Sequence, residues 1–573
     1  GDYNITGNWN VTIGSNQLSN FAFVSYRPNY ITANSSVTNN GTLTLTDVTS
    51  VNLKNIIVGM ELDLTNTTAI GQPTARMENK GNIVISHINN VFAARTIGMQ
   101  LDSLSTPSSI KGELINSGKI SLVNAPGTNY GHSSTGILIN NGTVSPVADV
   151  KVGNIDVKSN YGIGLEVARG NNTTLTGVNI DGSGGVIDMA GSYNVGAVIS
   201  APIASAGASN QISNVKNLNI NFDSLYSTGI IVGIENGQNT ILDNNLVQSF
   251  TANDNANSSV FIINYGGNVI VDSSLANVIN NNKGRGNVVL VNAEGSMINY
   301  MPITVGSGTK SGSGIYNGID TDTAFLQNYG DIVVNSTRDP DDFISSSVGI
   351  ATLRGTAENY ANITMNTDYS DALFGSVGSI TSNTGNIIVN GNSSVGIFAS
   401  VNGPGPTDKS TINLESGNIE LNGTRGTLFY IHGGSLGLGS VGNTVTATVN
   451  GENSYLFYST EDYYFNTGTA TINGNVNSEV KNGATAFFYQ GLSPLDPPVD
   501  LSAYLASVIN VNSGTLNVNI DNNSYLFGIS ATTLNISSLN NLQLTGANLT
   551  GSKRAKISDA TLNVDIDSNL DKL

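Results

Sequence analysis

The residue types that most often carry catalysis or bind metal ions are scarce in this sequence. Only three His are present, at His87, His132 and His432, and none has a second His at the spacing that zinc sites use. Cys is absent, which removes thiolate nucleophiles, disulfides and Cys-based metal sites. No Gly-x-Ser-x-Gly nucleophile motif occurs. The sequence therefore predicts no catalytic site, no metal site and no cofactor, and we do not expect an enzyme.

Acidic residues gather in three short groups, at residues 320–322, 339–342 and 461–462. The largest is Asp339-Pro-Asp-Asp, which supplies Asp339, Asp341 and Asp342. Clustered carboxylates are the ligands that Ca²⁺ prefers, and a pair of them can act as general acid and base. The simpler interpretation is a solvated acidic loop. We keep these three residues as candidates for binding a ligand rather than for catalysis.

Aromatic residues stand out in two expected loops, which hold Tyr463, Tyr464 and Phe465 in one and Tyr504 in the other. Aromatic rings near acids suit carbohydrate stacking or a protein-binding hot spot. Packing of these rings against the scaffold would also explain them. A repeated Tyr-Leu-Phe, which starts at Tyr455 and again at Tyr525, is interpreted as stacking within the core.

The charge balance excludes one class of partner. The 573 residues include 23 Lys and Arg against 41 Asp and Glu, a net charge of −18. Such a surface repels phosphate backbones, so we expect no nucleic-acid binding. The longest basic cluster, Lys553, Arg554 and Lys556, is interpreted as a solvated loop. No apolar run reaches the roughly 18 residues that a membrane-spanning helix needs.

Two short phrases recur along the chain and define its elements. The first is Asn-x-Gly followed by an alternating apolar strand, as in Asn79-Lys-Gly-Asn-Ile-Val-Ile85. The second is a small polar residue, then Gly, then an apolar run, as in Ser227-Thr-Gly-Ile-Ile-Val232. Strand-forming phrases at an irregular spacing favour a solenoid whose coils share strands and differ in their loops. We expect Gly and Asn to supply left-handed corners between the strands.

Helical patterns are almost missing, and parallel strands without crossover helices predict a β-helix. The preferred chirality of connections makes it right-handed. We expect an all-β, right-handed parallel β-helix of about 16 or 17 coils, with strands about 4.8 Å apart. Inward ladders should include Ile83, Ile85, Ile387 and Val389, and Asn side chains at equivalent corners should form hydrogen-bonded ladders.

The expected organisation is one continuous solenoid. Residues 1–35 would form a cap and the first coils, and residues 36–573 the β-helix. Loop insertions are expected near 305–325, 401–410, 459–466 and 490–508. The chain begins with Gly and stops directly after an alternating run, so we expect it to be a fragment of a longer protein.

The repeats resemble those of a known family. The phrases Asn383-Thr-Gly-Asn-Ile-Ile-Val-Asn-Gly-Asn-Ser-Ser-Val-Gly-Ile-Phe398 and Asn512-Ser-Gly-Thr-Leu-Asn-Val518 are similar to passenger repeats of type V autotransporter adhesins, above all the very large Asn-rich autotransporters of fusobacteria and their relatives. The resemblance covers nearly the whole chain as a repeat style. It implies a β-helix displayed at the cell surface by a C-terminal outer-membrane β-barrel, which this chain lacks. It also implies adhesion to a protein or glycan receptor on host or bacterial cells, without a site motif that could be transferred.

Two other functions stay open. A carbohydrate-active β-helix enzyme, such as a polysaccharide lyase or a glycosidase, would need two or three carboxylates within about 10 Å in a groove beside a cation. A passive stalk would only project another part of the protein. The position of the acids on the folded coils is the feature that separates the enzyme from the adhesin.

Overall fold

The computed structural model describes most of the chain. The described residues are 1–14, 21–28, 30–47, 56–64, 68–69, 71, 73–87, 95–103, 110–124, 134–141, 147–169, 178–199, 210–211, 215–233, 239–319, 321–342, 346–403, 405–460, 468–491, 499–500, 508–536 and 546–564. Strands account for 63% of the residues and helices for 2%, and the long sheets are parallel. The predicted parallel β-helix is therefore confirmed.

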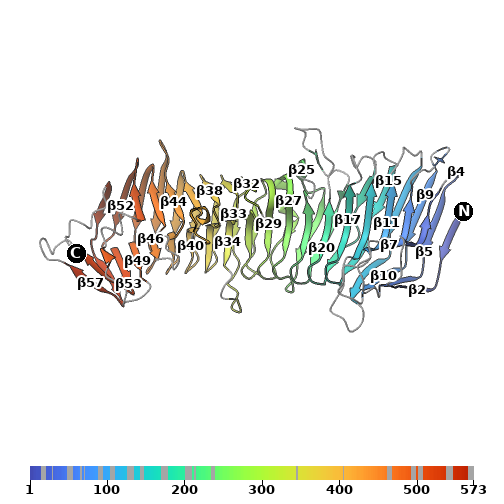
Figure 1. The fold of residues 1–573 in the computed structure, drawn as a ribbon, viewed down its shortest axis with the longest axis horizontal. Coiled ribbons are helices and arrows are strands. Elements are labelled where there is room, and N and C mark those ends of the chain that lie inside the picture. The colour runs from blue at the N-terminus through green and yellow to red at the C-terminus, as the bar shows by residue number, and fades with distance from the viewer. Residues whose placement is uncertain are drawn as a thin grey trace. The chain divides into compact units, whose positions relative to one another are not determined.

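The chain divides into two compact units, residues 1–291 with 295–297 and residues 292–294 with 298–573. Most coils of a unit contribute one strand to each of three parallel sheets. Successive coils stack on one another within the unit (Figure 1). Among the described residues, each unit contains one sheet of nine strands. Nine and nine strands correspond to 18 coils, slightly more than the 16 or 17 expected. The single continuous solenoid stays a prediction.

The first unit carries its strands in three columns. The first column consists of β1 (Asp2–Ile5), β5 (Ser35–Asn39), β9 (Thr74–Asn79), β12 (Lys111–Asn116), β15 (Val147–Lys151), β18 (Val178–Asp181) and β22 (Val215–Lys216). The second consists of β2 (Asn8–Ile13), β6 (Thr42–Asp47), β10 (Asn82–His87), β13 (Lys119–Asn124), β16 (Asn154–Val157), β19 (Ile187–Met189), β23 (Leu218–Phe222), β26 (Val247–Ala252) and β28 (Ile279–Asn280). The third consists of β3 (Phe21–Tyr26), β7 (Ile56–Asp63), β11 (Arg95–Ser103), β14 (Ser134–Asn141), β17 (Ile163–Arg169), β20 (Val195–Ile199), β24 (Thr228–Val232) and β27 (Val260–Val271).

The second unit repeats the arrangement. Its first column consists of β30 (Ile303–Val305), β33 (Ile332–Val334), β36 (Ile363–Met365), β39 (Ile387–Val389), β42 (Gly417–Leu421), β45 (Thr444–Val449), β48 (Asn475–Val480), β52 (Thr515–Ile520) and β55 (Ala547–Gly551). The next consists of β31 (Ser313–Asn317), β34 (Ser347–Thr352), β37 (Ser370–Gly375), β40 (Val395–Ser400), β43 (Thr427–His432), β46 (Tyr455–Thr460), β49 (Thr485–Gln490), β53 (Tyr525–Ser530) and β56 (Ala555–Ser558). The last consists of β32 (Phe325–Asn328), β35 (Thr356–Asn359), β38 (Ile380–Asn383), β41 (Thr411–Leu414), β44 (Ser435–Leu438), β47 (Thr469–Ile472) and β51 (Ile509–Val511).

The division between the units falls within a long strand, β29 (Val288–Asn299), which pairs with β31 and β32. The remaining short elements are β4 (Tyr30–Ile31), β8 (Thr68–Ala69), β21 (Asn210–Gln211), β25 (Asn239–Leu242), β50 (Val499–Asp500), β54 (Thr533–Ile536), β57 (Thr561–Val564) and the 3-10 turns η1 (Ser273–Asn277) and η2 (Pro406–Asp408).

Apolar side chains stack inside each unit, one above the next. Ile83 and Ile85 of the first unit and Ile387 and Val389 of the second are all 0% exposed, which confirms the predicted inward ladders. In the second unit Ile387 pairs in register with Ile363 on one side and Ile419 on the other. Alternation along each strand, repeated from coil to coil, therefore builds a continuous apolar interior.

Buried Asn residues form the predicted ladders. In the second unit Asn299 donates to Asn328 over 2.8 Å, Asn328 to Asn359 over 2.8 Å and Asn359 to Asn383 over 2.6 Å. Asn328, Asn359 and Asn383 also donate to the carbonyl two residues further on. The side-chain amides thus hydrogen-bond both to a carbonyl of their own turn and to an Asn of the neighbouring coil, so these buried polar groups have partners.

Glycine occupies many left-handed corners, as expected, for example Gly153 at φ 64° and Gly184 at φ 78°, and it also serves a second purpose. At the Asn-x-Gly turns, a Cβ added to Gly81 or Gly118 would overlap the carbonyl oxygen of the preceding coil. These positions need Gly because two backbones approach closely, not because φ is positive. Several left-handed corners are instead occupied by larger residues, such as Tyr161 at φ 57° and Tyr193 at φ 59°. The expectation that Gly and Asn supply the corners was therefore wrong at these positions.

The predicted insertions differ in character. Residues 305–325 are not one loop, because residues 313–317 form β31 within the stack. Residues 401–410 do leave the stack, and Val401 and Lys409 pair in an antiparallel bridge around η2. Most of 459–466 and of 490–508 lies outside the described residues.

Candidate functional site

The structure places only some of the residues selected from the sequence. Tyr463, Tyr464, Phe465 and Tyr504 lie outside the described residues. Asp339 is buried, at 2% exposed, and its carboxylate accepts the backbone N–H of Asp341 over 3.0 Å. The backbone N–H of Asp339 donates to the Ser311 hydroxyl of a neighbouring coil over 3.1 Å. Asp341 is exposed and Asp342 half-buried. The group therefore organises a turn, and within the described ranges no set of three or more His, Asp or Glu could hold a metal ion.

The most extensive candidate surface is a column of outward rings on the second unit. We call it the aromatic face, and its residues are Phe374, Phe398, Tyr430, Tyr458 and Phe488. They occupy equivalent positions of β37, β40, β43, β46 and β49, each in register with the next. Ring centroids are 5.2, 4.6, 5.1 and 5.1 Å apart along the column.

The preceding residue on each of these strands points inward. Leu373, Ile397 and Phe429 are 0% exposed, whereas Phe374, Phe398 and Tyr430 are half-buried. Burial raises the pKa of the Tyr430 and Tyr458 hydroxyls, so both stay neutral across the physiological range. The aromatic face is therefore apolar in its middle, with neutral hydroxyls at two rungs.

Tyr455 belongs to this surface and not to the core. Its ring lies 4.3 Å from that of Phe488 and 5.3 Å from that of Tyr458. Phe457 is the inward residue of the Tyr-Leu-Phe phrase, at 2% exposed. Tyr525 is also half-buried. The interpretation of both Tyr as core residues was wrong, because the two residues that follow each Tyr fill the apolar interior and the Tyr itself stays half-buried.

Polar groups border the aromatic face on both sides. On one side the Thr460 hydroxyl lies 2.9 Å from His432 Nδ1, and the Tyr458 hydroxyl donates to Gln490. On the other side burial raises the pKa of the Asp371 carboxyl to about 7, and the hydrogen bond from Ser346 opposes that shift only in part. An apolar centre with a hydrogen-bonding rim is the usual composition of a protein-binding or glycan-binding surface.

Two further stacks of exposed rings are interpreted differently. Tyr161, Tyr193 and Tyr226 stack in the first unit at 4.9 and 5.1 Å. Tyr300, Tyr329 and Tyr360 stack in the second at 5.3 and 4.8 Å. Their interplanar angles are 17° or less, so each ring covers the face of its neighbour and offers mainly its edge to solvent. These stacks hold coils together at their corners.

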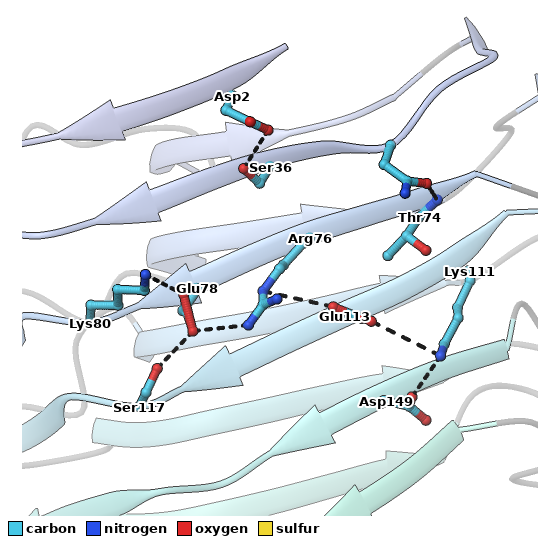
Figure 2. A network of polar contacts seen from close by, with 11 residues as sticks. Asp2, Ser36, Thr74, Arg76, Glu78, Lys80, Lys111, Glu113, Ser117 and Asp149 are labelled. Carbon is cyan, nitrogen blue, oxygen red and sulfur yellow. Dashed lines mark hydrogen bonds and ion pairs between the residues drawn. The ribbon is translucent and has the colours of Figure 1, made fainter.

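Charged side chains on the first unit form compensating ladders. Figure 2 shows Arg76 between Glu78, at 3.1 Å, and Glu113, at 3.7 Å. Lys111 lies 4.0 Å from the same Glu113 and 3.1 Å from Asp149 of the next coil. Each acid therefore has a cation on its own or a neighbouring coil. Half-exposed pairs of this kind add little stability individually, but they remove the repulsion between stacked like charges.

A second pair of stacked acids lies in a groove of about 480 Å³ on the first unit, lined by Lys119, Asn154, Asp156, Val186, Asp188, Asn221 and Thr251. Asp156 and Asp188 are in register on adjacent coils. Lys119 lies 2.5 Å and Lys158 3.8 Å from Asp156. Burial raises the pKa of Asp188, and the charges of Asp223 and Asp156 raise it further against a 2.9 Å hydrogen bond from Asn221.

These acids meet the geometric condition set for an enzyme. Stacked pairs of acids, however, occur elsewhere in the first unit: Glu113 and Asp149 are in register beside Lys111, and Asp63 and Asp102 are in register near Arg27. Proximity of carboxylates is thus a consequence of stacking charged positions and does not by itself separate enzyme from adhesin. The groove and the unequal surroundings of Asp156 and Asp188 are what single out that pair.

The sequence contained the signal for the aromatic face, since an aromatic residue follows the apolar run at each of its strands. The sequence did not show on which side of each strand this aromatic residue lies. Within the described ranges, no helix is long and apolar enough to cross a membrane. No family model, no curated protein and no solved structure matches this chain.

Proposed function

We propose that this chain is the passenger region of an autotransporter adhesin, displayed at a bacterial cell surface, which binds a receptor on host cells or on other bacteria. The aromatic face carries the proposal. Five rings in register, bordered by hydroxyl, imidazole and amide groups, make a surface that excludes water on contact and fixes a partner through its rim. The repeat style that resembles autotransporter passengers supports the placement.

The contrast with other outward positions supports a binding role. The corresponding outward column of the first unit's third sheet contains Glu61, Gln100, Leu138, Glu166 and Val198, in register from coil to coil. A scaffold therefore needs no large rings at such positions to stack its coils. Four of the five rings are half-buried and Phe488 is 9% exposed, and contact with a receptor would remove their remaining apolar area from water.

Binding of the fluorescently labelled chain to host epithelial cells and to bacterial cells tests the proposal. The double variant Tyr430→Thr, Tyr458→Thr should lose most of the binding. The control Tyr329→Thr removes a ring from an exposed stack of the same unit and should bind as the parent chain does. Equal binding by all three proteins would exclude the aromatic face, and no binding by the parent chain would favour a passive stalk.

A carbohydrate-active enzyme is the second candidate, favoured by the groove over Asp156 and Asp188. Strand neighbours in a parallel sheet lie about 4.8 Å apart, close to the roughly 5–5.5 Å that separates the two carboxyl groups of retaining glycosidases. Asp188, with its raised pKa, would be the acid, and Asp156, between two lysines, the nucleophile.

Reducing-end release from a panel of polysaccharides tests this second candidate. Activity that disappears in Asp156→Asn and in Asp188→Asn, but persists in Asp149→Asn, would establish it. Absence of release from every polysaccharide would leave these acids as part of the charge ladders.

A further inference from the structure

The C-terminal coils of the second unit contain a small polar groove that the aromatic face does not include. Its volume is about 370 Å³, and it is lined by Glu452, Asn482, Gly483, Asn523, Tyr525 and Lys556. These residues come from four successive coils. We propose that this groove binds an acidic sugar, a pyranose that carries a carboxylate. The inference goes beyond the proposed function because it names a second site and the chemistry of its ligand.

Cations gather around one ring of the groove. The guanidinium carbon of Arg554 lies 4.5 Å from the centroid of the Tyr525 ring, and Lys556 Nζ lies 5.6 Å from it. Over the described part of the chain, neither cation forms an ion pair with a carboxylate. Both cations are therefore available to an anionic ligand, and they lie beside the same ring of the groove. The interpretation of this basic cluster as a solvated loop was therefore incomplete.

The two cations have different tasks. Arg554 donates to the backbone carbonyls of Asn522 and Asn523, both over 3.3 Å, and so holds the turn that leads into Tyr525. It is a positioning residue. Lys556 lines the groove and donates to the Asn453 side chain, which uses one of its three N–H groups. The remaining donors of Lys556 can bind a carboxylate in the groove.

The amide residues of the groove are held in place by one carboxylate. Asp521 accepts the backbone N–H of Asn482 over 2.9 Å and that of Asn523 over 3.0 Å. Burial alone would raise the pKa of Asp521, but hydrogen bonds from Ser524, Asn482 and Asn523 outweigh it and lower the pKa. Asp521 therefore stays ionised, and the two Asn are preorganised before any ligand arrives.

The combination of groups selects a sugar over other acidic ligands. A Tyr ring offers an apolar surface to the C–H groups of a pyranose, and the side-chain amides of Asn482 and Asn523 can both donate and accept hydrogen bonds with hydroxyls. Glu452 adds an acceptor for hydroxyl groups. An acidic peptide would offer carboxylates but few hydroxyls for the two side-chain amides and Glu452 to bind. A neutral sugar would leave Lys556 without an anionic partner.

Methyl glucuronide and methyl glucoside are the matched probes, because they differ only in the carboxylate at C6. Isothermal titration and saturation-transfer NMR on the full chain should detect the glucuronide, with the glucoside at least about tenfold weaker. Tyr525→Ala should abolish binding of both probes. Lys556→Gln should bring the glucuronide down to the level of the glucoside, whereas the controls Tyr300→Ala and Lys310→Gln should bind as the parent chain does.

Three outcomes would overturn the inference. They are equal affinity for the two probes, no detectable binding of either, and glucuronide binding that is unchanged in Lys556→Gln. The result is independent of the proposed function. Cell binding that depends on Tyr430 and Tyr458 without glucuronide binding would refute the acidic-sugar site alone. Glucuronide binding without cell binding would refute only the adhesin.

Discussion

Replacing Asn359 by Ala removes the middle rung of the buried Asn ladder. The side chain is 1% exposed, donates to Ala361 O over 2.9 Å and to Asn383 over 2.6 Å, and accepts from Asn328 over 2.8 Å. Since the side chain also accepts the Ala361 N–H over 3.4 Å, the substitution leaves four buried groups short of a partner. Each such group costs about 1–3 kcal/mol, and they are not additive, so we expect the variant to lose about 2–5 kcal/mol.

The chain provides a matched control on the same coil. Asn366 also sits in an Asn ladder, donating to Asn335 over 2.7 Å and accepting from Asn390 over 2.7 Å. This ladder is exposed, so water can replace the missing amide. Asn366→Ala should therefore cost less than about 1 kcal/mol.

Native-state hydrogen exchange is the suitable assay, because a stacked solenoid does not have to unfold in a single step. The opening free energy should be measured at the amides of Ile363, on the altered coil, and of Ile387, on the next coil. A large loss for Asn359→Ala with a small loss for Asn366→Ala is the expected result. Equal losses, or a larger loss at Asn366, would refute the claim that burial makes the inner ladder important.

Three further predictions concern the interior, the turns and a titrating group. Ile387→Asp buries an unpaired charge at a 0% exposed position and should unfold several coils by circular dichroism, whereas Asp at the half-exposed neighbour Ile388 should be tolerated; the same melting for both would contradict the inward assignment. Gly81→Ala forces two backbones apart and should lower the melting temperature far more than Gly14→Ala, which has open space around it and no left-handed φ; the reverse order would contradict the close-approach argument. The raised pKa of Asp371, about 7 against 3.8, means that the folded state keeps this proton to higher pH, so stability should decline from about pH 4 to pH 7 in urea titrations. Asp371→Asn should lack that decline, and an unchanged pH profile would exclude this group.

Much of the architecture follows from local pattern alone. Alternation at Ile387 and Val389 identified the inward side of a strand, and repeated Asn at strand ends identified the ladders. Both signals can be read from a short stretch of sequence, because every coil repeats its neighbour and equivalent residues of successive coils pair in register. The role of Gly81 could not be predicted in this way, since a close approach depends on the neighbouring coil.

The candidate sites depended on information that the sequence does not hold. The phrase at Tyr455 contains three apolar residues in a row, and alternation does not decide which of them points outward. Asp156 and Asp188 are 32 positions apart and meet only because their strands stack in register. Tyr525, Asn482 and Lys556 likewise converge from separate coils, which no short motif records.

The central claim is that a receptor contacts the aromatic face. Photo-cross-linking tests it most directly, with the photoreactive amino acid p-benzoylphenylalanine in place of Phe398 and, in a control, in place of Tyr329. Both positions carry rings on the second unit, but only Phe398 lies in the aromatic face. Illumination on receptor-bearing cells should give a cross-linked product from position 398 and none from position 329. Cross-linking from position 329 alone, or binding without any product from position 398, would contradict the claim.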